Sequence, residues 1–254
     1  MSRKKVLVTG LSGVIGTGIR PYLGKKYELS ALNRRDVPGV PCYRADIADL
    51  EAIKPAFEGK DVVVHLAAVL GNAGWADTLR VNLVGCYNVF EASRLAAVKR
   101  IVFASSGAAV WGYENDFPYN AIMAGEYEKV PSNWPLLTTE SAVRPHGLYG
   151  ASKVWGEALG RYYSEAYRLS VICLRFGRVR AENRPVTPRD FSVWCSLRDA
   201  ARMVERCIDA PESVGFDVFY VVSDNQWRHR DIEHARQVVG YNPEDSADSF
   251  RQNL

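Results

Sequence analysis

The chain has 254 residues, 47% of them apolar and 24% charged, and its 32 basic and 29 acidic residues leave a net charge of +3. This composition excludes a disordered chain, a coiled coil and a collagen-like chain, and the balanced charge argues against nucleic-acid binding. No apolar run approaches the roughly 18 residues of a transmembrane helix, and the apolar stretch behind the basic start stops at Thr9. We therefore expect a cytoplasmic protein with neither a membrane nor a nucleic-acid partner.

The cysteines form no C-x-x-C pair and show no metal-ligand spacing. We expect reduced thiols, several of them in the core, and no metal site. They are Cys42, Cys86, Cys173, Cys195 and Cys207.

Short apolar runs alternate with helical patterns over the first 105 residues. Apolar strands separated by helices indicate a sheet that is covered on both faces. Right-handed crossovers then predict an α/β fold with a doubly wound parallel sheet. The expected strands are 4–9, 27–33, 41–44, 61–66 and 100–105, and the expected helices are 13–23, 50–57 and 76–95.

Residues 112–144 break this alternation, because they contain three prolines and several aromatic residues. A loop of this length in a compact domain is usually a functional lid or a partly ordered excursion. Its aromatic side chains either cover a ligand or pack the loop on the body, and the sequence does not separate these two readings. The aromatic residues of this region are Trp111, Tyr113, Phe117, Tyr119, Tyr127 and Trp134.

The remaining chain continues the α/β pattern. We expect helices at 149–168, 197–210 and 230–240 and strands at 170–175 and 216–222. This divides the chain into a main domain, 1–176, and a small C-terminal lobe, 177–254, within one structural unit. The lobe is expected over the carboxyl ends of the strands, where open α/β sheets bind their ligands.

A glycine triplet, Gly10, Gly13 and Gly16, follows the first strand and opens the first helix. Gly10 permits the turn, Gly13 the approach of a pyrophosphate, and Gly16 the packing of the helix on the sheet. The helix N-terminus then offers free N–H groups to phosphates. The alternative is a tight turn that binds nothing. The motif reads Thr9-Gly10-Leu11-Ser12-Gly13-Val14-Ile15-Gly16, and we expect Ser12, Val14 and Ile15 to contact the dinucleotide with the glycines.

The second strand ends in Asn33, Arg34 and Arg35, where an NAD enzyme carries an acid on the ribose hydroxyls. A neutral asparagine does not repel a 2′-phosphate and an arginine pairs with one, so NADP is favoured over NAD. Alternatively, both arginines are solvated and Asn33 holds an unphosphorylated ribose. Asp46 and Ile47 are expected to flank the adenine, unless Asp46 only helps to start the next helix.

Tyr149 and Lys153 are four residues apart and therefore share one helix face. A phenol ordinarily titrates near pH 10, and a nearby ammonium favours the phenolate. Such a pair exchanges a proton with an alcohol as hydride moves, and the lysine also reaches the nicotinamide ribose. At the end of the fifth strand, Ser106 is placed to bind the substrate oxygen. Alternatively, Tyr149 and Lys153 are only a pair on the surface of a helix, and Ser106 only helps the chain to turn.

Together these residues resemble the extended short-chain dehydrogenase/reductase superfamily, the NAD-dependent epimerases and dehydratases. The resemblance also rests on His65-Leu66-Ala67-Ala68 and on Asn82 within Val81-Asn82-Leu83-Val84-Gly85. It implies a Rossmann fold, with Leu66, Ala67 and Ala68 lining the cofactor and Asn82 supporting the fourth strand there. It also implies a Ser106, Tyr149, Lys153 triad, and a homodimer formed through helices 76–95 and 149–168.

A closer resemblance is to the uronate dehydrogenases, through residues 102–106, 147–157 and 240–245 and the short chain. By it, Arg175 binds a substrate carboxylate, although an arginine there is also common as a structural residue. Two departures argue against uronate specificity. Gly107-Ala108 stands where those enzymes carry Asn-His, and Leu70 stands at one of their serines.

The choice of serine has two rivals. Ser105 is the second candidate, and alignment on Val110-Trp111-Gly112 puts Gly107 at the usual hydroxyl position. Of the histidines, we expect His65 in the core and His229 and His234 at the surface.

These observations predict an NADP- or NAD-dependent oxidoreductase acting on a small hydroxylated or carbonyl substrate of the sugar or sugar-acid kind. The first alternative is a sugar epimerase or dehydratase that retains its NAD. The second is a non-catalytic dinucleotide sensor.

Overall fold

The computed structural model describes residues 3–71 and 73–253. Seven parallel strands form its sheet in the order β3-β2-β1-β4-β5-β6-β7, which confirms the predicted doubly wound topology. The strand order reverses beside β1, so the crevice at the carboxyl ends of β1 and β4 is the expected ligand site. The strands are β1 (Lys5–Thr9), β2 (Glu28–Asn33), β3 (Cys42–Arg44), β4 (Val62–His65), β5 (Arg100–Ser106), β6 (Ser170–Phe176) and β7 (Phe216–Val221).

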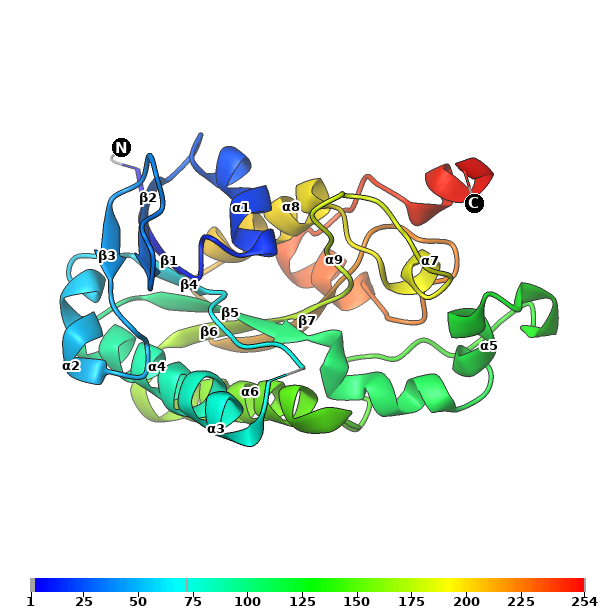
Figure 1. The fold of residues 1–254 in the computed structure, drawn as a ribbon, viewed down its shortest axis with the longest axis horizontal. Coiled ribbons are helices and arrows are strands. Elements are labelled where there is room, and N and C mark those ends of the chain that lie inside the picture. Colours follow the sequence, from blue (N-terminus) through cyan, green and yellow to red (C-terminus); the bar gives the residue numbers. More distant parts are fainter. Residues whose placement is uncertain (1–2, 72, 254) are drawn as a thin grey trace.

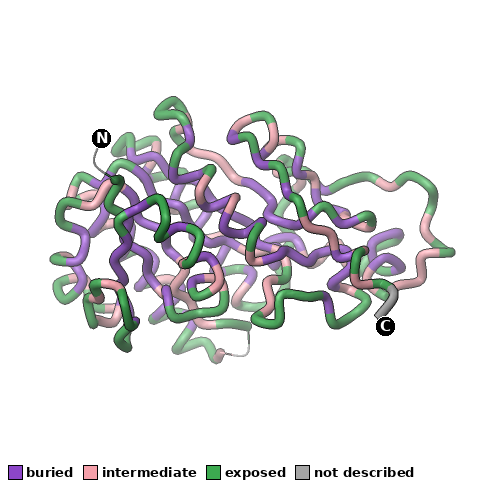
Figure 2. Tube along the Cα trace, turned by 90° about the horizontal axis from the view of Figure 1, so that it is seen from above, coloured by how far each residue is buried: buried purple, intermediate pink, exposed green. Residues whose placement is uncertain are grey.

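Helices cover both faces of this sheet (Figure 1). Alternate strand residues explain the two layers: Val6 and Val8 join the core under one set of helices, and Leu7 joins the core under the other. The buried backbone accordingly runs through the middle of the molecule, with exposed segments around it (Figure 2). One face carries α1 (Val14–Leu23), α8 (Leu197–Ile208) and α9 (Glu233–Val239), and the other α3 (Trp75–Asp77), α4 (Cys86–Leu95) and α6 (Gly147–Tyr167).

Two predicted helices are subdivided. The helix expected at 50–57 is α2 (Leu50–Ile53) followed by a 3₁₀ turn, η1 (Lys54–Phe57), because Pro55 has no N–H for the α-helical ladder. The helix expected at 76–95 contains a π-helical segment, η2 (Thr78–Gly85), between α3 and α4. Both changes leave the element in its expected place.

Residues 112–144, here called the insert, contain helical elements and are not one long loop. They contain the end of η3 (Gly107–Asn115), α5 (Tyr119–Ala124) and η4 (Tyr127–Lys129). Trp227 stacks with Trp134 at a centroid distance of 5.3 Å and with Tyr127 at 4.2 Å. Tyr127 and Trp134 therefore pack the insert on the C-terminal segment, whereas Phe117 is exposed.

One part of the C-terminal segment joins the main sheet and helix layers, and the other part lies outside them. Helix α8 and strand β7 belong to the main layers, whereas the stretches 177–196 and 223–253, with α7 (Asp190–Val193) and η5 (Ala247–Asn253), form the rest of the lobe. The boundary at residue 176 stays a prediction. No helix among the described residues is long and apolar enough to cross a membrane. The thiols of all five cysteines are free, and four of them are buried.

The prediction of a surface position for His229 is wrong. It precedes α9, is fully buried, and its Nδ1 lies 2.8 Å from Ser192 Oγ. His234, on α9, is partly exposed, and its Nε2 lies 2.7 Å from a carboxylate oxygen of Asp217. The surface position was inferred from a helical polar pattern, but tertiary packing of the insert covers His229.

Candidate active site

The glycine turn brings the first strand close to the segment after β4. Gly10 has φ +72°, a conformation that favours glycine, and a Cβ on it would lie 2.7 Å from Ala67 N. Gly13 caps α1 without a side-chain hydrogen bond, and the first turn has no acidic residue. The first N–H groups of α1 are thus available to an anion.

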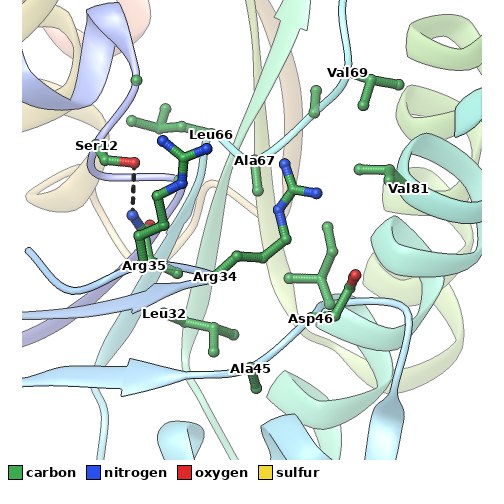
Figure 3. A pocket seen from close by; sticks show the side chains of 15 residues that line it. Ser12, Leu32, Arg34, Arg35, Ala45, Asp46, Leu66, Ala67, Val69 and Val81 are labelled. Carbon is green, nitrogen blue, oxygen red and sulfur yellow. Dashed lines mark hydrogen bonds between the residues drawn. The ribbon is translucent and has the colours of Figure 1, made fainter. Parts of the chain in front are cut away.

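Beside this turn lies a cavity of about 370 Å³, here called the β2 cavity (Figure 3). Asn33 Nδ2 donates a 2.7 Å hydrogen bond to Ser12 Oγ, which fixes the end of β2 against the glycine turn. Arg34 and Arg35 extend from there over the cavity, and both are exposed. Further predicted cofactor residues line it, namely Gly10, Gly13, Asp46, Ile47, Leu66, Ala67 and Ala68.

Asp46 lines this cavity and does not start the next helix. Its carboxylate accepts a 3.0 Å hydrogen bond from Ala48 N and pairs with Arg80 at 2.5 Å. Burial opposes its ionisation, but these two contacts prevail and lower the pKa of Asp46 below its ordinary value. Helix α2 is capped instead by Asp49, which accepts from Ala52 N at 3.1 Å.

A second cavity of about 560 Å³, here called the α6 cavity, lies at the carboxyl ends of β5 and β6. Ser106, Tyr149 and Lys153 all line it, together with the predicted cofactor residues Val14, Ile15 and Gly16. The glycine turn, Leu66 and Ala68 line both cavities. The two cavities therefore adjoin across the N-terminus of α1.

Helix α6 places the tyrosine and the lysine one turn apart. Lys153 is buried, its Nζ donates to Ala104 O at 2.8 Å, and it lies 5.5 Å from the centroid of the Tyr149 ring. Ser106 Oγ accepts a 3.1 Å hydrogen bond from Ala108 N, which leaves its O–H to donate elsewhere. Three groups that can bind or transfer a proton thus face one cavity.

Ser105 and Arg175 belong to one buried cluster, of which Ser105 lines this cavity. Ser105 Oγ donates to Glu157 at 2.5 Å, and Arg175 pairs with both oxygens of Glu157 at 2.8 and 2.9 Å. Burial disfavours its charge, but Glu157 outweighs burial and raises the pKa of Arg175. Arg175 does not line the α6 cavity, so its place corresponds to the structural alternative rather than to a carboxylate ligand.

Two further predicted residues support the site from behind. Asn82 bridges Val69, whose N–H it accepts at 2.8 Å, and Ser152 Oγ, and it lines neither cavity. His65 is buried as expected, with Nδ1 2.7 Å from Thr9 Oγ1. Burial, with a smaller effect of Lys153, lowers the pKa of His65 to about 3, so the ring is neutral.

The sequence reasoning missed the arginines of the C-terminal segment. Arg178, Arg189 and Arg230 line the α6 cavity, and Glu114 of the insert contacts Arg189 and Arg230. These residues lie in polar stretches without a local motif. The one available signal is Gly107, since a glycine directly behind a site serine leaves room for a distant side chain.

The two cavities fit a nicotinamide dinucleotide. Gly10 and Gly13 line both cavities, a Cβ at Gly10 would lie 2.7 Å from Ala67 N, and Gly13 begins α1 without a side-chain cap. Asn33, Asp46 and Ala67 would hold the adenosine side, and Ile15, Tyr149 and Lys153 the nicotinamide side.

Comparison with known proteins gives concordant matches. A model of the NAD dependent epimerase/dehydratase family matches residues 6–201. An NAD-dependent glucose-6-phosphate dehydrogenase of Haloferax volcanii is 33% identical over 256 residues, covering 96% of this chain and 95% of that protein. An L-arabinose 1-dehydrogenase (NAD(P)(+)) of the same organism is 30% identical over 253 residues, with 96% and 97% covered.

Solved structures agree with these matches. The crystal structure of uronate dehydrogenase from Agrobacterium tumefaciens is 29% identical, with a TM-score of 0.84 over 99% of this chain and 88% of that one. A mutant of uronate dehydrogenase from that organism, complexed with NAD, gives a TM-score of 0.83 at 28% identity, with 99% and 88% covered.

Proposed function

The chain belongs to the NAD dependent epimerase/dehydratase family, and we propose that it is an NAD(P)-dependent dehydrogenase that acts on a small sugar or sugar derivative through Ser106, Tyr149 and Lys153. The observation that carries the proposal is the convergence of these three side chains on the α6 cavity. Relatives of similar length named as dehydrogenases of glucose 6-phosphate, L-arabinose and uronate support the substrate class.

The proposed mechanism divides the proton chemistry among the three residues. The bound dinucleotide accepts or supplies the hydride. In the oxidation direction, the Tyr149 phenol oxygen takes the hydroxyl proton of the substrate, and in reduction it returns it. The Lys153 ammonium lies 5.5 Å from the centroid of the Tyr149 ring and is placed to hold the nicotinamide ribose beside it. Ser106 donates its free O–H to the same substrate oxygen and holds it in place.

The experiment that tests this mechanism is the variant Tyr149→Phe. Loss of a positioned general acid–base should lower kcat by roughly 10²- to 10⁴-fold, while the Kd for NADH, measured by fluorescence titration, stays near its original value. Tyr22→Phe, on the exposed side of α1, is the matched control and should keep full turnover. Full turnover by Tyr149→Phe would refute the proposed triad.

An epimerase or dehydratase is the second candidate, favoured by the family model that the chain matches. Such an enzyme keeps its NAD bound while hydride leaves and returns. The dinucleotide released on denaturing the purified protein separates the two. A stoichiometric amount of NAD favours the epimerase or dehydratase, and an empty protein that reduces added NAD or NADP in the presence of a sugar favours the dehydrogenase.

We also propose a preference for NADP over NAD. Strand β2 ends in the neutral Asn33, and Asp46, the one carboxylate that lines the β2 cavity among the described residues, is paired with Arg80. Arg34 and Arg35 bring two guanidinium groups to the same edge. The ratio of kcat/KM for the two cofactors with one sugar measures the preference directly.

A homodimer through α4 and α6 is a further part of the proposal. These neighbouring helices expose large apolar side chains, which a partner copy would cover. Sedimentation at micromolar concentration tests the dimer, and a monomer would contradict it. The exposed residues are Tyr87 and Leu95 on α4 and Leu148, Tyr162 and Tyr167 on α6.

A further inference from the structure

Arg230 is a buried arginine that lines the α6 cavity with few partners. Its exposed fraction is 1%, yet its guanidinium has one ion-pair contact, from Nη2 to Glu114 Oε1 at 3.2 Å. Its Nε is buried without a hydrogen-bond partner among the residues that the structure describes. A buried charged group with open donors is costly unless something completes it.

Arg189, Arg230 and their shared partner Glu114 together leave one positive charge in excess. Glu114 is already bound by Arg189 through two hydrogen bonds of 2.7 Å, so one carboxylate serves two guanidinium groups. Burial is the main cause that lowers the pKa of Arg230 to about 10, which still keeps it charged at neutral pH. The same burial holds the pKa of His229 well below its ordinary value, so His229 adds no charge.

The neighbouring ion pairs do not offset this excess. Arg175 is neutralised by Glu157 and Arg180 by Asp190. Arg178 also lines the cavity, at its exposed side, and the described residues contain no carboxylate that lines the α6 cavity. The cavity therefore has the charge of a site for an anion.

Gly107 puts this charge next to the reacting position. A Cβ on Gly107 would lie 2.5 Å from Arg230 Cζ, so the guanidinium lies against the backbone directly after Ser106. A side chain at residue 107 would displace Arg230. One ligand in the α6 cavity can therefore place an oxygen at Ser106 and an anionic group at Arg230.

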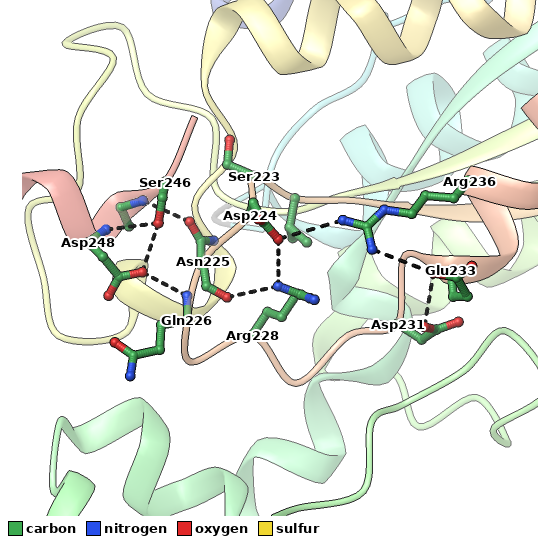
Figure 4. A network of polar contacts seen from close by, with 12 residues as sticks. Ser223, Asp224, Asn225, Gln226, Arg228, Asp231, Glu233, Arg236, Ser246 and Asp248 are labelled. Carbon is green, nitrogen blue, oxygen red and sulfur yellow. Dashed lines mark hydrogen bonds and ion pairs between the residues drawn. The ribbon is translucent and has the colours of Figure 1, made fainter. Parts of the chain in front are cut away.

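The insert holds the backbone on both sides of Arg230 in the chain, because Leu137 N donates to His229 O at 2.7 Å and Leu137 O accepts from Asp231 N at 2.9 Å. Polar contacts also fix the stretch that precedes Arg230: Asp224 contacts both Arg228 and Arg236, and Gln226 N donates to Asp248 (Figure 4). Such support pre-organises a charged group, which reduces the cost of ordering it when a ligand binds.

We propose, resting on the dehydrogenase function above, that Arg230 binds an oxyanion of the substrate and selects anionic sugars over neutral ones. The oxyanion is a carboxylate or a phosphate, and both present oxygens that a guanidinium fork can bind. Arg230 is thereby a specificity-determining residue, and Gly107 is the position that admits it.

The test compares D-glucuronate and D-glucose 6-phosphate with L-arabinose and D-glucose, using wild type and Arg230→Gln. We expect wild type to prefer one anionic sugar, and the variant to raise its KM by roughly tenfold to a hundredfold, with kcat/KM for the neutral sugars within about threefold. The preferred anion identifies carboxylate or phosphate. Gly107→Ala should reproduce this shift by displacing Arg230.

A matched control separates recognition from structural support. Arg100 is also buried, but it binds backbone carbonyls at the opposite end of β5, among them Ala210 O at 2.7 Å. Arg100→Gln should lower stability and leave the ratio of anionic to neutral kcat/KM unchanged. If Arg230→Gln also leaves this ratio unchanged, or if wild type prefers neutral sugars, the inference is overturned.

Calorimetry distinguishes failure of this inference from failure of the proposed function. D-glucuronate and D-glucose 6-phosphate are titrated into the protein loaded with NADH, with no turnover required. Binding that Arg230→Gln abolishes supports the anion site even if no sugar is oxidised, and in that case only the dehydrogenase proposal falls. Turnover of neutral sugars together with absence of anion binding would reject the anion site alone.

Discussion

The β2 cavity takes most of its residues from strand ends and from the turns that follow them, so neighbours in the cavity are often near neighbours in the chain. The α6 cavity brings together residues that are far apart in the chain, such as Ser106 and Arg230 or Trp111 and Arg189. Local geometry fixes the first, whereas docking of the insert on the C-terminal segment fixes the second. The dinucleotide side is therefore readable from motifs, and the substrate side depends on packing.

The largest expected effect is a loss of stability when the buried pair of Arg175 and Glu157, next to the α6 cavity, is broken. Glu157→Gln leaves Arg175 buried without its counter-charge, which should cost about 3–5 kcal/mol of the free energy of unfolding. Urea titration measures this. The exposed pair Glu51–Lys54 is the control, since Glu51→Gln should change stability by less than about 0.5 kcal/mol. Equal losses would show that the Arg175–Glu157 pair is hydrated.

Arg34→Ala tests the β2 cavity alone. Removing the guanidinium should raise the Kd for NADPH by roughly tenfold to a hundredfold, because a charged hydrogen bond to the 2′-phosphate is lost. The Kd for NADH and the KM for the sugar should stay within about threefold. Arg3→Ala, exposed at the start of the chain, is the control. An equal loss for both dinucleotides would contradict 2′-phosphate recognition.

Gly10→Ala tests whether dinucleotide binding needs free space at the glycine turn as well as the positive φ of Gly10. A side chain at positive φ costs about 1–2 kcal/mol, and at Gly10 the added Cβ also meets Ala67. Gly59 has φ +64° and nothing within 4 Å of its Cβ, so Gly59→Ala pays only the conformational cost. We expect weaker dinucleotide binding for Gly10→Ala alone. Unchanged binding would argue against a dinucleotide site at this turn.

The smallest expected effects concern how the stability of the protein depends on pH through two buried histidines, His65 at the end of β4 and His229 before α9. Burial lowers the pKa of His65 to about 3 and that of His229 well below its usual value. Below about pH 6.5 the unfolded chain therefore binds protons that the folded chain does not, and stability falls as pH decreases. Each histidine should contribute up to about 1.4 kcal/mol per pH unit between pH 6.5 and pH 4.

The variants His65→Gln and His229→Gln separate these contributions. Unfolding free energies measured across this pH range should show a shallower slope for each variant than for wild type. If His229→Gln does not change the slope of the unfolding free energy against pH, His229 is accessible to protons in the folded protein. That result would also weaken the contrast between the β2 cavity and the more tightly packed region before Arg230.

Much of the fold followed from local patterns. The alternation of apolar runs and helices predicted all seven strands, and the glycine triplet predicted the turn before α1. The spacing of Tyr149 and Lys153 predicted one helix face, which α6 provides. These features succeed because backbone geometry and nearby residues decide them.

The misplacements share one physical origin. Arg175 was assigned to the substrate, but its neighbour across the layer, Glu157, occupies it. His229 was assigned to the surface, but the insert buries it. A side chain's partners across a fold carry no local signal, so charge and polarity alone misplace such residues.

The sequence by itself thus determined the doubly wound sheet and the residues of the glycine turn, because hydrogen-bond ladders and glycine conformations are local requirements. Only the tertiary structure decided which arginine reaches the α6 cavity. That choice depends on how the insert docks through Trp134 and Leu137, and on the space at Gly107. These contacts join segments that are more than ninety residues apart in the chain, and no short stretch of sequence contains them.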